Sequence, residues 1–159
     1  MEIQDIDPKN LFLVLDFDGV LTDNRVLVSS TGEESVICSR ADGLGFDILK
    51  NNNISCLVLS SETNNVVKVR CNKLGIECLS SQKNKELVIK DLKKRNPDKK
   101  IIYIGNDLND YKAMKESDFV LCPKDSSKEV KSIADIILDT KGGHGVVREI
   151  AVAILSLSF

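Results

Sequence analysis

The stretch LFLVLDFDGVLTD (residues 11–23) places acidic side chains directly after a five-residue apolar run. Leu11–Leu15 has the pattern of a strand that is buried on both faces. Asp16 and Asp18 follow it, and side chains two residues apart in an extended chain point to the same side. Neighbouring carboxylates repel each other, and a bound cation relieves that repulsion. The stretch therefore predicts a rigid strand that presents two acids to one cavity.

The composition indicates one globular domain over residues 1–159, with 42% hydrophobic and 29% charged residues. A net charge of -2 and the absence of Trp disfavour a nucleic-acid partner. The five cysteines form no C-x-x-C pair, which is typical of reduced thiols in the cytoplasm. Residues 1–10 lack the apolar core of a signal peptide, and residues 150–159 are too few to cross a membrane. We expect a cytoplasmic protein without a membrane partner.

Apolar runs alternate with helical patterns along most of the chain. This alternation predicts an α/β fold with a doubly wound, mostly parallel sheet. Two further buried strands are expected at Ile54–Ser60 and Lys100–Gly105, and a hairpin insertion at about Arg25–Ser39, too small to act as a cap domain. Helices are expected at 43–51, 63–74, 84–96, 109–115, 128–133 and 146–155, with short strands at 77–79, 119–121 and 136–138.

Polar side chains follow each of the long predicted strands, where the ligands of such sheets bind. They are Asp16 and Asp18 after the first strand, Ser60, Ser61 and Glu62 after the second, and Asn106, Asp107 and Asp110 after the third, with Lys83 and Lys85 in an intervening loop. Taken singly, each segment is explained as a turn or a helix cap. Their predicted convergence at one edge instead favours an oxygen-rich site, which suits Mg²⁺.

The segment DFDGVLTD resembles the first motif of the haloacid dehalogenase superfamily, D-x-D-G-V-x-T-D. Most members of that superfamily are Mg²⁺-dependent phosphohydrolases. Ser60 and Lys85 match the second and third motifs, and GNDLND resembles the acidic fourth motif. The resemblance extends from about Leu11 to Ile154. It implies phosphate transfer from a substrate to an aspartate side chain, followed by hydrolysis.

The resemblance also implies a role for each matching residue. Asp16 would be the nucleophile, Asp18 the acid and base, and Lys85 the charge-balancing lysine, for which Lys83 is a nearby competitor. The implied phosphate-binding residues are Gly19, Ser60, Ser61 and Lys85, and the implied metal ligands are Asp16, Asp18, Asn106, Asp107 and Asp110. The fourth motif begins Gly-Asn-Asp where the family more often has Gly-Asp-Asp. Whether Asn106 or Asp107 is the third ligand therefore stays open.

Two further segments resemble the cap-free branch of the superfamily. These are SRADGLGFDIL (residues 39–49) and KGGHGVVREI (residues 141–150). The branch contains phosphatases of sugar-acid phosphates, typically homotetramers in which a neighbouring subunit covers each active site. The implied substrate-binding residues are Asp42, Gly43, Glu62, Arg70 and Lys73.

The residues after Ser60 favour one sugar acid over another. Octulosonate-type members usually have Gly-Arg there, whereas Ser61-Glu62 with Arg70 and Lys73 resembles the nonulosonate type. We therefore expect a phosphatase of a nonulosonate (N-acylneuraminate) 9-phosphate. The alternatives are a 3-deoxy-D-manno-octulosonate 8-phosphate phosphatase and a non-catalytic oligomerisation module related to acylneuraminate cytidylyltransferases. A receiver-type signalling domain is disfavoured, because its phospho-accepting aspartate follows a middle strand.

Overall fold

The computed structural model describes residues 7–155, in which six strands form one parallel sheet in the order β5-β4-β1-β6-β7-β8. β1 (Leu11–Leu15) lies between β4 (Ser55–Leu59) and β6 (Lys100–Ile104). The outer strands are β5 (Glu77–Leu79), β7 (Phe119–Cys122) and β8 (Ile136–Ile137). The predicted doubly wound α/β fold is confirmed. The predictions for the first six residues and for the end of the apolar stretch, residues 156–159, fall outside the described residues.

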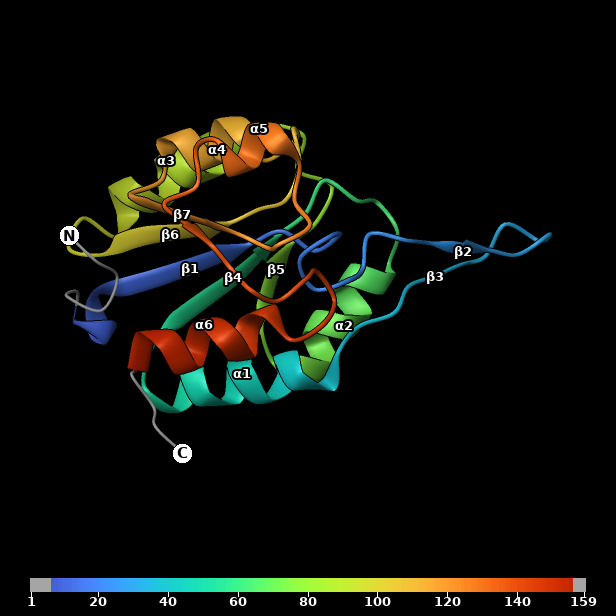
Figure 1. The fold of residues 1–159 in the computed structure, drawn as a ribbon, viewed down its shortest axis with the longest axis horizontal. Coiled ribbons are helices and arrows are strands. Elements are labelled where there is room, and N and C mark those ends of the chain that lie inside the picture. The colour runs from blue at the N-terminus through green and yellow to red at the C-terminus, as the bar shows by residue number, and fades with distance from the viewer. Residues whose placement is uncertain (1–6, 156–159) are drawn as a thin grey trace.

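Helices cover both faces of the sheet (Figure 1). One face carries α1 (Arg40–Asn51), α2 (Val66–Leu74) and α6 (Val146–Leu155), and the other carries α3 (Lys85–Arg95), α4 (Tyr111–Glu116) and α5 (Lys128–Lys131). A short 3₁₀ helix, Pro8–Asn10, precedes β1. Alternate residues of β1 serve the two layers, because Leu13 and Leu15 pack in one core cluster and Val14 in the other. This burial on both faces explains why β1 is an unbroken apolar run.

Two helices begin three residues away from the predicted start, where side chains bind backbone N–H groups. α1 begins at Arg40, three residues earlier than expected, since the Ser39 hydroxyl accepts a hydrogen bond from the Ala41 N–H. α2 begins at Val66, three residues later than expected. Side-chain oxygens of Glu62 and Asn64 accept backbone N–H groups in the turn before it.

The hairpin projects from the edge of the sheet at which the strands end (Figure 1). Its ladder is short, because only β2 (Leu27–Val28) and β3 (Glu34–Ser35) pair, and an isolated bridge between Thr22 and Cys38 closes its base. Residues 7–155 contain no cap domain beyond this hairpin. Within the same range, no helix has the length and apolar character needed to cross a membrane. All five cysteines are free thiols.

The topology brings the ends of three strands together. Leu15, the last residue of β1, pairs with Val58 of β4 and with Ile104 of β6. The chain runs outward from β1 to β5 and then returns to β6, so the direction of winding reverses beside β1. The carboxyl ends at such a reversal point are the usual ligand site of open α/β sheets.

Candidate active site

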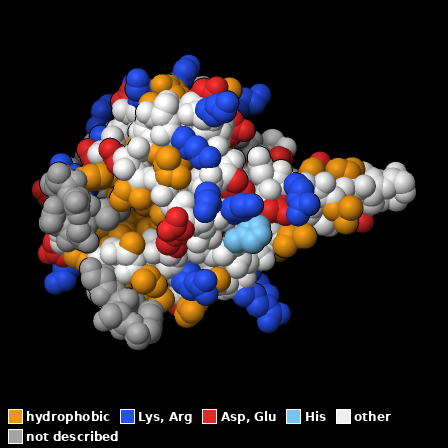
Figure 2. Space-filling model, viewed as in Figure 1, with side chains coloured by type: hydrophobic (Ala, Val, Ile, Leu, Met, Phe, Trp, Pro, Cys, Tyr) orange, Lys and Arg blue, Asp and Glu red, His pale blue; other side chains and the backbone are white. Residues whose placement is uncertain are grey.

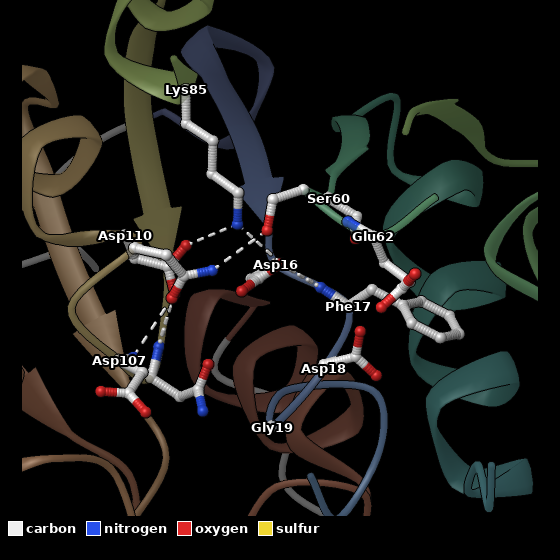
Figure 3. Close-up of polar contacts among 12 residues, drawn as sticks. Asp16, Phe17, Asp18, Gly19, Ser60, Glu62, Lys85, Asp107 and Asp110 are labelled. Carbon is white, nitrogen blue, oxygen red and sulfur yellow. Dashed lines mark hydrogen bonds and ion pairs between the residues drawn. The ribbon is translucent and has the colours of Figure 1, made fainter. Parts of the chain in front are cut away.

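Asp16 and Asp18 follow the end of β1, where the winding of the sheet reverses. The Asp16 N–H continues the strand ladder, donating to the Ile104 carbonyl at 2.9 Å. The chain then turns tightly, with Gly19 at a φ of +81°, a value at which residues other than glycine are strained. Asp16 is 3% exposed and Asp18 is partly buried. Both carboxyl groups line the same cavity, as the spacing predicts (Figure 3).

Lys85 is the cation of this site. It is the first residue of α3, its side chain is 1% exposed, and its Nζ lies 2.8 Å from an oxygen of Asp16 and 2.8 Å from an oxygen of Asp110. Lys83, the alternative in the sequence, is exposed. The structure therefore places Lys85 against the acids and leaves Lys83 at the surface.

Asp110 has a different position from the one expected of a metal ligand. It is fully buried and is not among the residues that line the cavity. One carboxylate oxygen accepts from Lys85 Nζ and from the Tyr103 hydroxyl, each at 2.8 Å, and the other accepts from the Asn106 N–H at 2.9 Å. These donors engage both oxygens, so Asp110 anchors Lys85 and the loop after β6, and its role as a metal ligand stays a prediction.

Sequence reasoning missed Asn24 and Asn109, which line the cavity, and Tyr103, which lies behind it. Tyr103 lies in β6, is fully buried, and donates its hydroxyl to Asp110. The available signal was a tyrosine in an otherwise aliphatic strand, because a buried phenol normally requires a hydrogen-bond partner.

The carboxyl groups of the site hold protons more firmly than isolated acids do. Burial, followed by the negative charge of Asp110, raises the pKa of Asp16 to about 8, although Lys85 opposes this shift. Burial, followed by the charge of Glu62, also raises the pKa of Asp18. Burial lowers the pKa of Lys85, but its two carboxylate partners outweigh this and raise the pKa overall. A bound cation would favour the ionised form of both carboxyl groups in place of these protons, so the site suits a cation.

The cavity itself is polar and has a volume of about 160 Å³. Its lining consists of Asp16, Asp18, Asn24, Ser60, Ser61, Glu62, Asn106, Asp107 and Asn109. Every one of these side chains carries an oxygen atom that can serve as a ligand or an acceptor. A hydrated divalent cation with a phosphate group matches both the size and the chemistry of this space.

The residues after β4 form one wall of the cavity (Figure 3). Ser60 is 1% exposed, and its hydroxyl accepts from the Glu62 N–H at 3.1 Å. The Glu62 carboxylate accepts from the Thr63 and Asn64 N–H groups, which lowers its pKa. Glu62 therefore both organises the turn before α2 and faces the cavity.

Four of the five predicted metal ligands, Asp16, Asp18, Asn106 and Asp107, line the cavity. Within residues 7–155, no three acidic, histidine or cysteine side chains converge as a metal cage. Asn106 is 7% exposed and packs against Gly19, where an added Cβ would lie 1.9 Å from Asn106 Nδ2. Asp107 is exposed at the mouth, and one of its oxygens accepts from the Leu108 N–H. Asp16 and Asn106 fit a Mg²⁺ site in which water supplies the other ligands, since Mg²⁺ commonly keeps several waters.

A second cavity, of about 260 Å³, adjoins the first. Asp18, Asn24 and Glu62 line both, and the second adds Arg25, Val26, Glu34, Val36, Asn64 and Val66. The Asn64 side chain donates to Glu34 at 3.0 Å, which ties β3 of the hairpin to the turn before α2. This space combines an apolar surface with hydroxyl-binding groups.

Four of the predicted substrate-binding residues line neither cavity of this chain. Asp42 is 2% exposed and accepts from the Val147 N–H, and Gly43 packs towards Leu74. Arg70 donates to the Ser39 carbonyl, and Lys73 is exposed on α2. Glu62 precedes α2, so it does not share a face of that helix with Arg70 and Lys73.

Comparison with known proteins identifies the class. Residues 47–150 match the haloacid dehalogenase-like hydrolase family, and the chain belongs to that family. It is 31% identical to the 3-deoxy-D-manno-octulosonate 8-phosphate phosphatase KdsC of Salmonella typhi over 87% of this chain and 75% of that protein.

Two solved structures of similarly named enzymes share the fold. The cobalt-bound phosphatase of Haemophilus influenzae matches with a TM-score of 0.86 and 31% identity, covering 95% of this chain and 91% of that one. The phosphatase of Moraxella catarrhalis, in complex with magnesium, phosphate and KDO, matches with a TM-score of 0.88 and 29% identity, covering 97% and 90%.

Proposed function

We propose that this phosphoric monoester hydrolase removes phosphate from a sugar-acid phosphate in a Mg²⁺-dependent reaction. The observation that carries the proposal is the polar cavity at the end of β1, where Asp16, Asp18 and Ser60 surround a space of phosphate size. The first candidate substrate is 3-deoxy-D-manno-octulosonate 8-phosphate, because the similar proteins named above are phosphatases of that compound.

Asp16 is the nucleophile in this proposal. Its carboxylate attacks phosphorus, a new bond forms between an Asp16 oxygen and phosphorus, and the bond from phosphorus to the sugar oxygen breaks. Lys85, 2.8 Å from Asp16, offsets the negative charge of the two reacting anions. The Ser60 hydroxyl, which lines the cavity, can donate to the phosphate oxygens.

Asp18 handles the protons. Its raised pKa suits a group that is protonated when the substrate binds. It gives its proton to the leaving sugar oxygen, and the resulting carboxylate then takes a proton from the water that hydrolyses the aspartyl-phosphate. Thr22 orients it, because its hydroxyl donates to an Asp18 oxygen at 3.4 Å.

A bound Mg²⁺ would supply positive charge that offsets the repulsion of the two reacting anions. Asp16 and Asn106 are the side chains proposed to hold it, with Asp107 at the mouth as the alternative to Asn106. An amide oxygen is a neutral ligand, so this chain offers one negative charge fewer than a site with aspartate at position 106.

The second cavity is the proposed place of the sugar. Val26, Val36 and Val66 offer an apolar surface to C–H groups, and Glu34 and Glu62 offer acceptors to hydroxyls. Glu62 also supports a second candidate substrate, a nonulosonate 9-phosphate, since it stands where the octulosonate type usually has arginine. Both candidates are polyhydroxylated acids with a terminal phosphate.

A homotetramer is proposed from the exposed apolar side chains of the hairpin. Val26, Leu27, Val28 and Ile37 are between 51% and 74% exposed. Figure 2 shows hydrophobic side chains along this projection. Such a group is a typical association surface. Light scattering after size-exclusion chromatography would distinguish a tetramer from a monomer, and a monomer at enzyme-assay concentrations would contradict the proposal.

The function is tested with a substrate panel. Phosphate release is measured from 3-deoxy-D-manno-octulosonate 8-phosphate and N-acetylneuraminate 9-phosphate, with Mg²⁺ or with a chelator. We expect release that requires Mg²⁺, and an Asp16→Asn variant that folds but is inactive. Asp98→Asn, a change at an exposed acid, is the matched control. Absence of release from both compounds would favour the non-catalytic oligomerisation module.

A further inference from the structure

The loop between β8 and α6 packs directly behind the loop that carries Asp18. We call residues 138–145 the C-terminal loop and residues 16–24 the first loop. An added Cβ on Gly142 would lie 2.2 Å from the Gly19 carbonyl oxygen, and one on Gly143 would lie 2.5 Å from the Asp23 nitrogen. The Gly143 N–H donates to the Val20 carbonyl at 2.9 Å. Backbone therefore lies against backbone, with no side chain between the two loops to absorb a displacement.

The first loop transmits its position to Asp18 through Thr22. The Thr22 hydroxyl is buried, accepts from the Gly19 N–H at 3.2 Å, and donates to Asp18 at 3.4 Å. Gly142 and Gly143 contact Gly19 and Thr22, the same two residues that set the Asp18 side chain. A shift of the C-terminal loop therefore moves the support of the proposed acid and base.

The C-terminal loop is held in turn by carboxylates. Glu149 accepts from the Asp139 and Thr140 N–H groups, each at 2.9 Å, and Asp125 accepts from the Gly142 N–H at 3.0 Å. These bonds fix the start of the loop. Its end is fixed where α6 begins.

Asp42 fixes that end. One of its oxygens accepts from the Val147 N–H at the start of α6, at 2.8 Å. The contact is close, because an added Cβ on Gly45 would lie 2.5 Å from the Arg148 nitrogen. The other Asp42 oxygen is buried and has no hydrogen-bond partner among residues 7–155. A half-satisfied buried acid is costly, so its presence calls for a compensating role.

We propose that Asp42 is a positioning residue for Asp18, acting through the start of α6 and the C-terminal loop. This inference rests on the proposed role of Asp18 as the general acid. It gives a structural role to residues 39–49 and 141–150, which do not line the cavity. Asp42 holds the beginning of α6, and the glycines pass that position to the first loop.

The test uses two aryl phosphates of similar shape. p-Nitrophenyl phosphate has a weakly basic leaving group that needs little protonation, whereas phenyl phosphate has a strongly basic one that needs the acid. The ratio of kcat/KM for the two compounds reports how well Asp18 donates its proton. A smaller folded fraction lowers both values equally and leaves this ratio unchanged.

Asp42→Ala removes the acceptor for Val147, and Gly143→Ala puts a methyl group against Asp23. We expect each variant to raise the ratio of kcat/KM for p-nitrophenyl phosphate to that for phenyl phosphate about tenfold. Asp18→Asn should raise this ratio further. Asp42→Asn keeps an oxygen for Val147 and should retain the parent ratio. Gly75→Ala is the matched control, because Gly75 has a φ of +64° but lies far from the first loop, with only Lys50 Nζ near its added Cβ.

The outcomes separate the two proposals. A parent-like ratio in Asp18→Asn would overturn the acid role and the inference with it. A raised ratio in Asp18→Asn, with parent-like ratios in Asp42→Ala and Gly143→Ala, would overturn the inference alone. If Asp42→Ala does not fold, a parent-like ratio in Gly143→Ala still overturns the inference, because Asp42 is proposed to act through that contact between the loops.

Discussion

Replacing Asp42 by asparagine should change how the stability of the protein depends on pH. Burial is the main cause that raises the pKa of Asp42, from 3.8 to about 6, although the Val147 hydrogen bond and nearby cations oppose it. Its carboxyl group therefore stays protonated in the folded protein at pH values where the unfolded chain has already ionised. Because the folded state binds the extra proton, stability falls as pH rises between the two pKa values.

The size of the effect follows from the shift. The pKa shift is about two units, and each unit corresponds to roughly 1.4 kcal/mol. The free energy of unfolding of the parent therefore falls by up to about 3 kcal/mol once the pH exceeds the folded pKa of Asp42. Asparagine cannot ionise, so the variant lacks this decline. The free energy of unfolding of Asp42→Asn, minus that of the parent, should therefore increase by about 2.5 kcal/mol between about pH 4 and about pH 7.5.

Urea unfolding of both proteins in a chelating buffer measures this difference. The comparison cancels the contribution of Asp16, whose pKa is also raised, because both proteins contain it. Asp98→Asn is again the control, and its unfolding should follow the pH dependence of the parent. A difference between Asp42→Asn and the parent that stays constant across this pH range, or shrinks as the pH rises, would refute the reasoning.

Three further predictions concern the site. Lys85→Met leaves Asp16 and Asp110 facing each other without a cation. The kcat should fall about 100-fold or more, and the free energy of unfolding in urea should fall by about 3 kcal/mol. A parent-like kcat would contradict the charge-balancing role. Asn106→Asp adds a negative ligand and should tighten Mg²⁺ binding about tenfold by calorimetry, whereas unchanged affinity would exclude position 106 from the metal site. Tyr103→Phe removes a buried donor and should cost about 1 kcal/mol in urea unfolding; equal stability would show that the hydroxyl bond to Asp110 contributes little.

Much of the fold was predictable because the signals are local. The apolar run of β1, with burial on both faces, marks a central parallel strand. The regular alternation of strands and helices then leaves few topologies for the sheet. Helix starts were less predictable, because they depend on the side-chain cap at Ser39 and on turn hydrogen bonds of Glu62 and Asn64. A cap is a single hydrogen bond, and it leaves no periodic trace in the sequence.

The sequence by itself determined the pairing of Asp16 with Asp18, since a two-residue spacing at the end of a strand makes both face one cavity. Only the tertiary structure decided what the other polar residues do. The hydrogen bonds of Asp110 with Lys85 and Tyr103 could not be inferred from its place in the fourth motif. Asp42 meets Val147 across 105 positions of the chain. Such roles depend on which hydrogen-bond donors the packed fold brings to each carboxylate oxygen. The spacing of residues along the chain does not contain that information.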